Sequence, residues 1–185
     1  MSVARSYAQA VFELICEKAP GAPDALQAEK ELGALAASVS ASPELTRLLS
    51  GTVISSEQRG ALVAAIAQKM NLSPIVLRAA KIAAEKGRVS LFTQIHDEYV
   101  KIRVGHDGGV LGELVSAEPI EPKDQEELSQ AFAKKLGKKI VFRTKVDPSL
   151  IAGLKVVVDG VTYDGSVKAQ LQRAKASLHS ITAHA

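Results

Sequence analysis

The sequence predicts an α+β protein with two parts. We expect a six-helix bundle over residues 1–104, a linker over 105–109 and a small β-α-β-β-α domain over 110–185. Alanine and apolar residues at helical spacing dominate the first part, whereas glycine and β-branched runs dominate the second. The change falls at a glycine-rich segment, and glycine clustered with short polar residues is typical of a linker. A length of 185 residues suits one large domain or two small ones.

Helix start signals divide the first part. Small polar residues that favour the N-cap position stand at each expected start: Ser2, Asp24, Ser42, Ser55 and Ser73. Gln58 follows Ser55 by three residues, which is the spacing of a capping box. A sixth helix is indicated by one buried stripe: Leu91, Ile95, Tyr99 and Ile102. Six short helices in this length indicate a compact bundle.

The second part alternates between strand and helix patterns. In chain order we expect a strand over 110–117, a helix over 122–136, a strand over 140–146 and a hairpin signal over 156–163. Asp159-Gly160 suits the turn of that hairpin, because both central residues of a type I′ turn have positive φ. A final helix is expected from one narrow apolar face: Val167, Leu171, Ala174, Leu178 and Ile181.

Composition argues against an enzyme and against a membrane span. The four histidines form no pair at metal-ligand spacing, and no nucleotide-binding or nucleophile motif occurs. The single cysteine, Cys16, indicates a reducing compartment. No apolar run approaches the ~18 residues of a membrane helix, and no signal or transit peptide is evident. We therefore expect no catalytic residue, no cofactor, no metal and no direct membrane insertion.

A basic cluster brackets Gly137 and leaves one alternative function open. Its members are Lys134, Lys135, Lys138 and Lys139. Lysines in this position suit phosphate contacts, so an RNA-binding accessory protein is the alternative. They equally complement the dipole at the end of a helix. Aromatic residues are only 4% of the chain and the net charge is only +3, and both values argue against a nucleic-acid partner.

Two helices carry more apolar surface than the outside of a bundle needs. Projected at 100° per residue, the apolar arc of the first helix covers roughly 200° and that of the fifth roughly 220°. Either both helices are central in the bundle, or one edge of each lines a groove for an amphipathic helix of a partner. Periodicity does not say which edge faces outward.

Five short motifs then occur in order along the chain: Tyr7-Ala8-x-Ala10-Val11-Phe12, Ala84-Glu85-Lys86-Gly87-Arg88, Val115-Ser116-Ala117, Val146-Asp147-Pro148-Ser149-Leu150-Ile151-Ala152-Gly153 and Asp164-Gly165-Ser166-Val167. Together they resemble the delta subunits of bacterial ATP synthases, whose mitochondrial counterpart is the oligomycin-sensitivity-conferring protein. The resemblance covers essentially the whole chain without an insertion. It implies the fold described above and a non-catalytic subunit.

The resemblance also implies partners. Members of this family cap the peripheral stalk, one copy per complex, at the cytoplasmic face of the bacterial plasma membrane. Their first domain takes the N-terminal helix of an alpha subunit between helices 1 and 5, and their second domain joins the C-terminal ends of the b subunits. Carried over, the expected contacts of the alpha helix are Ala8, Val11, Phe12, Ile15, Leu77, Ala80, Lys81 and Ala84. On this basis Val11→Asp is expected to weaken alpha binding without unfolding the bundle.

Overall fold

The computed structural model describes residues 2–51, 54–150 and 152–166. It divides into two compact units, Met1–Arg103 and Val104–Ala185, and each is described here by itself. The predicted helix with Val167, Leu171, Ala174, Leu178 and Ile181 lies outside the described residues.

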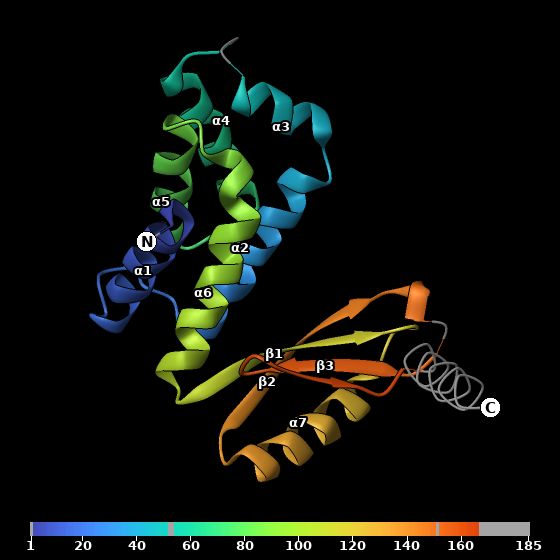
Figure 1. The fold of residues 1–185 in the computed structure, drawn as a ribbon. Helices are drawn as coiled ribbons and strands as arrows, with labels where there is room; N and C mark the ends of the chain where they lie inside the picture. The colour runs from blue at the N-terminus through green and yellow to red at the C-terminus, as the bar shows by residue number, and fades with distance from the viewer. Residues whose placement is uncertain (1, 52–53, 151, 167–185) are drawn as a thin grey trace, which may run out of the picture. The chain divides into compact units, whose positions relative to one another are not determined.

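The first unit is a bundle of six α-helices in its described part (Figure 1). These are α1 (Val3–Cys16), α2 (Ala25–Ser40), α3 (Pro43–Ser50), α4 (Ser56–Lys69), α5 (Pro74–Glu85) and α6 (Phe92–His106), with a 3₁₀ turn, η1 (Val89–Leu91), before α6. The buried side chains of α1, α2, α5 and α6 form one apolar cluster with Leu49, Val63 and Val89. The predicted six-helix organisation is confirmed.

Four of the five predicted N-caps are confirmed at the level of the side chain. The cap oxygens of Ser2, Asp24, Ser42 and Ser55 each accept a backbone N–H from the first turn of their helix. The capping box of Ser55 and Gln58 is complete in both directions. Ser73 differs: its own backbone N–H donates to Glu31 Oε2 on α2 at 2.8 Å. A side chain of one helix thereby fixes where α5 starts.

Tyr99 of α6 lies at the centre of the bundle and is fully buried. Its ring packs edge-on against Phe12 of α1, with the ring centroids 5.9 Å apart. Its hydroxyl donates to the backbone carbonyl of Ala25 at 3.0 Å, so the buried polar group is satisfied. The residue therefore ties α1, α2 and α6 together through one side chain.

Burial raises the pKa of the Tyr99 hydroxyl above its ordinary value. A tyrosine in the unfolded chain ionises at about pH 10, whereas Tyr99 in the folded chain is still protonated at that pH. Ionisation therefore favours the unfolded chain: the stability is fully present below about pH 10 and is lost as the pH rises further. We expect this loss to reach about 1.4 kcal/mol per pH unit in urea titrations, and Tyr99→Phe to remove it. Equal alkaline slopes for both proteins would contradict this assignment.

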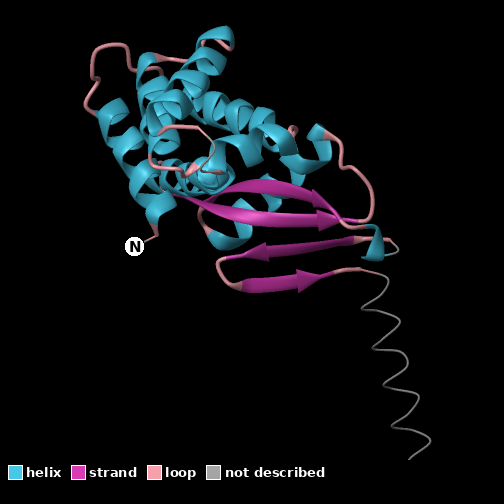
Figure 2. Cartoon of the chain, turned by 90° about the horizontal axis from the view of Figure 1, so that it is seen from above, coloured by secondary structure: helices cyan, strands magenta, loops and turns pink. Residues whose placement is uncertain are grey.

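The second unit contains a four-stranded sheet with order β2-β1-β3-β4 (Figure 2). Its described elements are β1 (Gly109–Ser116), α7 (Pro122–Leu136), β2 (Lys139–Val146), a 3₁₀ turn η2 (Pro148–Leu150), β3 (Leu154–Val158) and β4 (Val161–Asp164). Strand β1 is parallel to β2 and antiparallel to β3, and β3 is antiparallel to β4. Helix α7 is the connection between the two parallel strands.

The predicted order β-α-β-β-α is wrong by one strand. The described part reads β-α-β-β-β, because the hairpin signal forms two paired strands, β3 and β4. Asp159 and Gly160 have φ values of 51° and 77°, which allow this turn to stay tight and both flanks to pair. At the junction of the units, α6 continues to His106 and β1 begins at Gly109.

Helix α7 covers one face of the sheet. Leu128, Phe132, Ala133 and Leu136 of α7 pack on the buried strand residues Leu114, Ile140, Phe142, Val156 and Val158. Gly112 is required on this face, because a Cβ atom there would lie 2.7 Å from the ring of Phe142. The core of the second unit therefore lies between α7 and this face of the sheet.

Candidate partner-binding groove

Helices α1 and α5 lie side by side and run in opposite directions. Arg88, just beyond the end of α5, donates from Nη1 to the hydroxyl of Tyr7 in the first half of α1 at 3.2 Å. At the other end, a Cβ atom on Gly21, just beyond α1, would lie 3.0 Å from the Pro74 side chain at the start of α5. These two contacts show that the start of α1 lies near the end of α5 and that the end of α1 lies near the start of α5.

Helix α4 occupies one side of α5. The Arg59 side chain of α4 donates to the carbonyl of Ala84 at 3.3 Å. Gly60 lets the two helices approach, since a Cβ atom there would lie 2.7 Å from Glu85 Cγ. Leu77 and Ala84 are on this side and are half-buried and buried, while Lys81 stays exposed with its Nζ 3.9 Å from Glu85 Oε1. This edge of α5 is therefore committed to the bundle.

The eight residues that the resemblance implies as contacts of the alpha helix stay a prediction, and the structure shows how far each is exposed. Six of them are buried in the apolar cluster of the bundle: Ala8, Val11, Phe12, Ile15, Ala80 and Ala84. Val11 is only 2% exposed, so an aspartate there would enter the core. Both arcs are wide enough to have two apolar edges, and the neighbouring helices cover the edge that carries these six residues.

The opposite edges of both arcs face outward. They form what we call the exposed stripe, whose members are Val3, Tyr7, Ala10 and Leu14 on α1 and Ala79 and Ile82 on α5. Val3 and Ile82 are each 42% exposed and Leu14 is 39% exposed. Along α1 these residues are three or four positions apart, the spacing of one helix face. All six residues belong to the apolar arcs found by helical projection of the sequence. Which edge of each arc faces solvent depends on tertiary packing.

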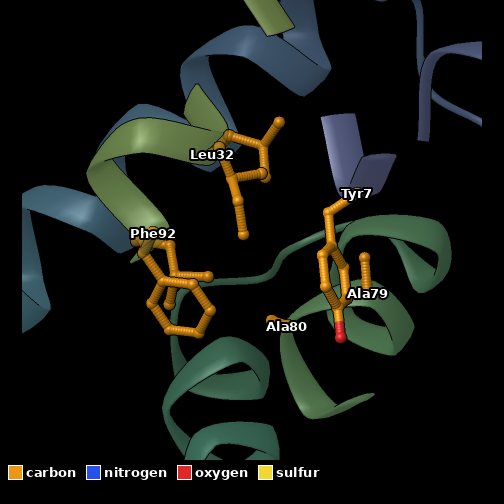
Figure 3. A pocket seen from close by; sticks show the side chains of 7 residues that line it. Tyr7, Leu32, Ala79, Ala80 and Phe92 are labelled. Atoms are coloured by element: carbon orange, nitrogen blue, oxygen red, sulfur yellow. The ribbon is translucent and has the colours of Figure 1, made fainter. Parts of the chain in front are cut away.

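A small apolar pocket lies where α1, α2, α5 and α6 pack together. Its lining comes from four helices: Tyr7, Leu32, Leu35, Ala79, Ala80, Phe92 and Ile95. Figure 3 shows Tyr7 and Ala79 on one side of the pocket and Phe92 on the opposite side. The volume of about 10 Å³ is no more than a single water occupies. Five of the seven lining residues are buried, so this is a small void in the apolar core of the bundle, and it is too small for a cofactor.

The basic cluster around Gly137 has partners within the second unit. Lys135 Nζ lies 4.6 Å from the ring centroid of Tyr163, and Lys138 Nζ lies 3.1 Å from Asp159 Oδ2. Gly137 has φ 66° and ends α7, as a left-handed C-cap glycine does. Lys134 and Lys135 stand in the last helical turn, where they complement the dipole. These contacts favour the structural interpretation of the lysines over the RNA-binding alternative.

The described residues contain no group of three or more His, Cys, Asp or Glu side chains placed to hold a metal. In that same part of the chain, no helix has the length and apolar character needed to cross a membrane.

Comparisons with known proteins agree over nearly the whole chain. The family model described as "ATP synthase delta (OSCP) subunit" matches residues 3–178. Two similar curated proteins are named ATP synthase subunit delta. The one from Caulobacter vibrioides is 33% identical over 172 residues, covering 93% of this chain and 91% of the relative. The one from Cereibacter sphaeroides is 34% identical over 169 residues, covering 91% and 89%.

The fold matches a chain in the solved structure of the Toxoplasma gondii mitochondrial ATP synthase hexamer. The TM-score is 0.67, with 96% of this chain and 98% of that chain covered. At 18% sequence identity this similarity concerns the fold.

Proposed function

The chain belongs to the ATP synthase delta (OSCP) subunit family, a non-catalytic part of ATP synthase, and on that premise we propose that its first unit docks the N-terminal helix of an alpha subunit along the exposed stripe. The second unit joins the C-terminal ends of the stalk b subunits. The chain acts as a peripheral link at the cytoplasmic face of the bacterial membrane, one copy per complex. It holds the catalytic head against the torque of the rotor while ATP is made.

The observation that supports the alpha site is the exposed stripe itself. Leu14 and Ile82 are large, exposed apolar side chains on two neighbouring helices, and Tyr7 and Ala79 of the same stripe pack on the bundle core. Scattered apolar residues are normal on a protein surface, but apolar residues at helical spacing on two adjacent helices are typical of a helix-binding surface. The partner implied is an amphipathic helix whose apolar side chains are three and four residues apart.

The buried residues carried over from the family support this groove from below. Val11, Phe12 and Ala80 are buried in the apolar cluster beneath the stripe. Because Ala10 and Ala79 of the stripe are small, the backbone of a third helix can approach closely. We therefore propose that the alpha helix contacts the exposed stripe and that the buried set positions it.

The size of such a joint suits a component that must resist torque. Burying about 600 Å² of apolar surface contributes roughly 15 kcal/mol before costs, at 25 cal/mol per Å². Loss of translational and rotational freedom and ordering of the helix offset much of this. The net affinity is then sufficient for a stable but non-covalent link.

The charges on α5 add a second feature to the alpha site. Arg78 is exposed and lies one turn from Ile82 on the same helix, and Arg88 lies at the end of the groove beside Tyr7. A partner helix with acidic residues flanking its apolar stripe would meet these guanidinium groups. Electrostatic complementarity of this kind sets orientation and association rate more than affinity.

Isothermal titration calorimetry of the full chain with a synthetic alpha N-terminal peptide tests this proposal. We expect one-to-one binding with a negative heat-capacity change, because apolar surface is buried. A peptide with the same composition in scrambled order is the control, since it lacks the amphipathic pattern. Equal heats from the two peptides would remove the proposed site.

A further inference from the structure

The sheet of the second unit has a face turned away from α7, which we call the open face. Side chains alternate between the faces of a strand, so its members follow from the register. They are Leu111, Glu113 and Val115 of β1; Lys139, Val141, Arg143 and Lys145 of β2; Lys155 and Val157 of β3; and Thr162 and Asp164 of β4. Its apolar members are half-buried and are not part of the cluster on which α7 packs.

The register organises the open face into an apolar area with a basic end. Leu111 of β1 lies opposite Val141 of β2. Two positions further along the same face, beyond the pair Glu113 and Arg143, Val115 lies opposite Lys145 on one side and Lys155 on the other. Residues opposite each other on neighbouring strands bring their Cβ atoms within about 5 Å. Two lysines therefore flank one valine across three adjacent strands.

The open face carries a surplus of positive charge. Glu113 lies opposite Arg143, so these two charges offset each other. Asp164 lies opposite Lys155 and offsets part of its charge. The face as a whole still carries four basic residues against two acidic ones. The chain's own C-terminal segment, 167–185, contains basic residues and no Asp or Glu, so its charge does not complement this face.

We propose that the open face docks an amphipathic helix with an acidic flank. Its apolar stripe would cover Leu111, Val115 and Val141, and its carboxylates would meet Lys145 and Lys155. A second copy of this chain would bring the same basic surface and be repelled. The inference rests on the proposed function in one respect: the b subunits of the peripheral stalk are the source of the helix.

The test measures binding of the full chain to the purified water-exposed part of the b subunits. Lys145→Glu/Lys155→Glu should weaken binding at least tenfold at low salt and less at high salt, because salt screens partly exposed charges. Lys123→Glu/Lys134→Glu is the matched control: it makes the same change of charge at two exposed lysines of α7 and should bind normally. Thermal unfolding confirms that each variant is folded.

The other outcomes separate this inference from the function on which it rests. Tight binding that both double variants leave unchanged would overturn the open face while leaving the stalk link intact. No binding of the unaltered chain to the b subunits would overturn the stalk link itself. A higher melting temperature of Lys145→Glu/Lys155→Glu with unchanged b affinity would assign the face to the chain's own basic C-terminal segment and would also overturn the inference.

Discussion

Leu14→Asp should lower the affinity for the alpha N-terminal peptide at least tenfold while the bundle stays folded. Leu14 is 39% exposed on the α1 half of the exposed stripe, so the carboxylate remains hydrated in the free protein. In the complex it would lie against an apolar side chain and lose that hydration without gaining a partner, at a cost of about 2 kcal/mol or more. Calorimetry gives the affinity, and circular dichroism gives the melting temperature.

Leu48→Asp provides a closely matched control. Leu48 is also 39% exposed, is also on a helix of the first unit, and belongs to α3 rather than to the exposed stripe. The same substitution at the same exposure should leave peptide affinity unchanged. If both variants bind the peptide as the unaltered chain does, the exposed stripe is not the docking surface.

Val11→Asp should strongly destabilise the first unit, although the sequence alone favours a stably folded variant with weakened binding. Val11 is 2% exposed and belongs to the apolar cluster of the bundle. A carboxylate placed there has lost its hydration, and the loss of stability should be about 4 kcal/mol or more. That is a large part of the total of about 5–15 kcal/mol typical of a domain. Urea denaturation followed by circular dichroism measures it.

Val3→Asp separates burial from helix propensity in this experiment. Val3 is on the same helix and is 42% exposed, so the same substitution should change the free energy of unfolding by no more than about 0.5 kcal/mol. An acidic residue in the first turn also suits the helix dipole. Similar stability losses at both positions would contradict the placement of Val11 in the core.

Local signals made the helices and their starts predictable. Two helix ends depend only on residues close to them in the sequence: the capping box of Ser55 and Gln58, and the C-cap glycine Gly137. Such ends are therefore predictable from the sequence. The hairpin turn at Asp159-Gly160 is local in the same sense. Ser73 was predicted as the N-cap residue of α5, but its hydrogen bond to Glu31 was not, because Glu31 lies on a different helix.

The sequence predicts how wide the apolar arcs of α1 and α5 are. It does not predict which edge of each arc faces solvent. Periodicity shows that the apolar arcs of α1 and α5 are wider than packing on one side of a bundle requires. Both edges of each arc are equally apolar in the sequence. The edge that faces solvent depends on how the neighbouring helices pack. Helix α4 contacts α5 at Gly60, and Arg88 donates a hydrogen bond to Tyr7. These contacts join residues far apart in the sequence, so a helical projection cannot contain them.

Purification of the tagged chain from native membranes in mild detergent shows whether the chain links the catalytic head to the peripheral stalk. We expect alpha and b subunits to be retained together, and we expect Leu14→Asp to lose alpha preferentially while Leu48→Asp loses neither. Recovery of the chain without the subunits of the head and stalk would contradict this expectation.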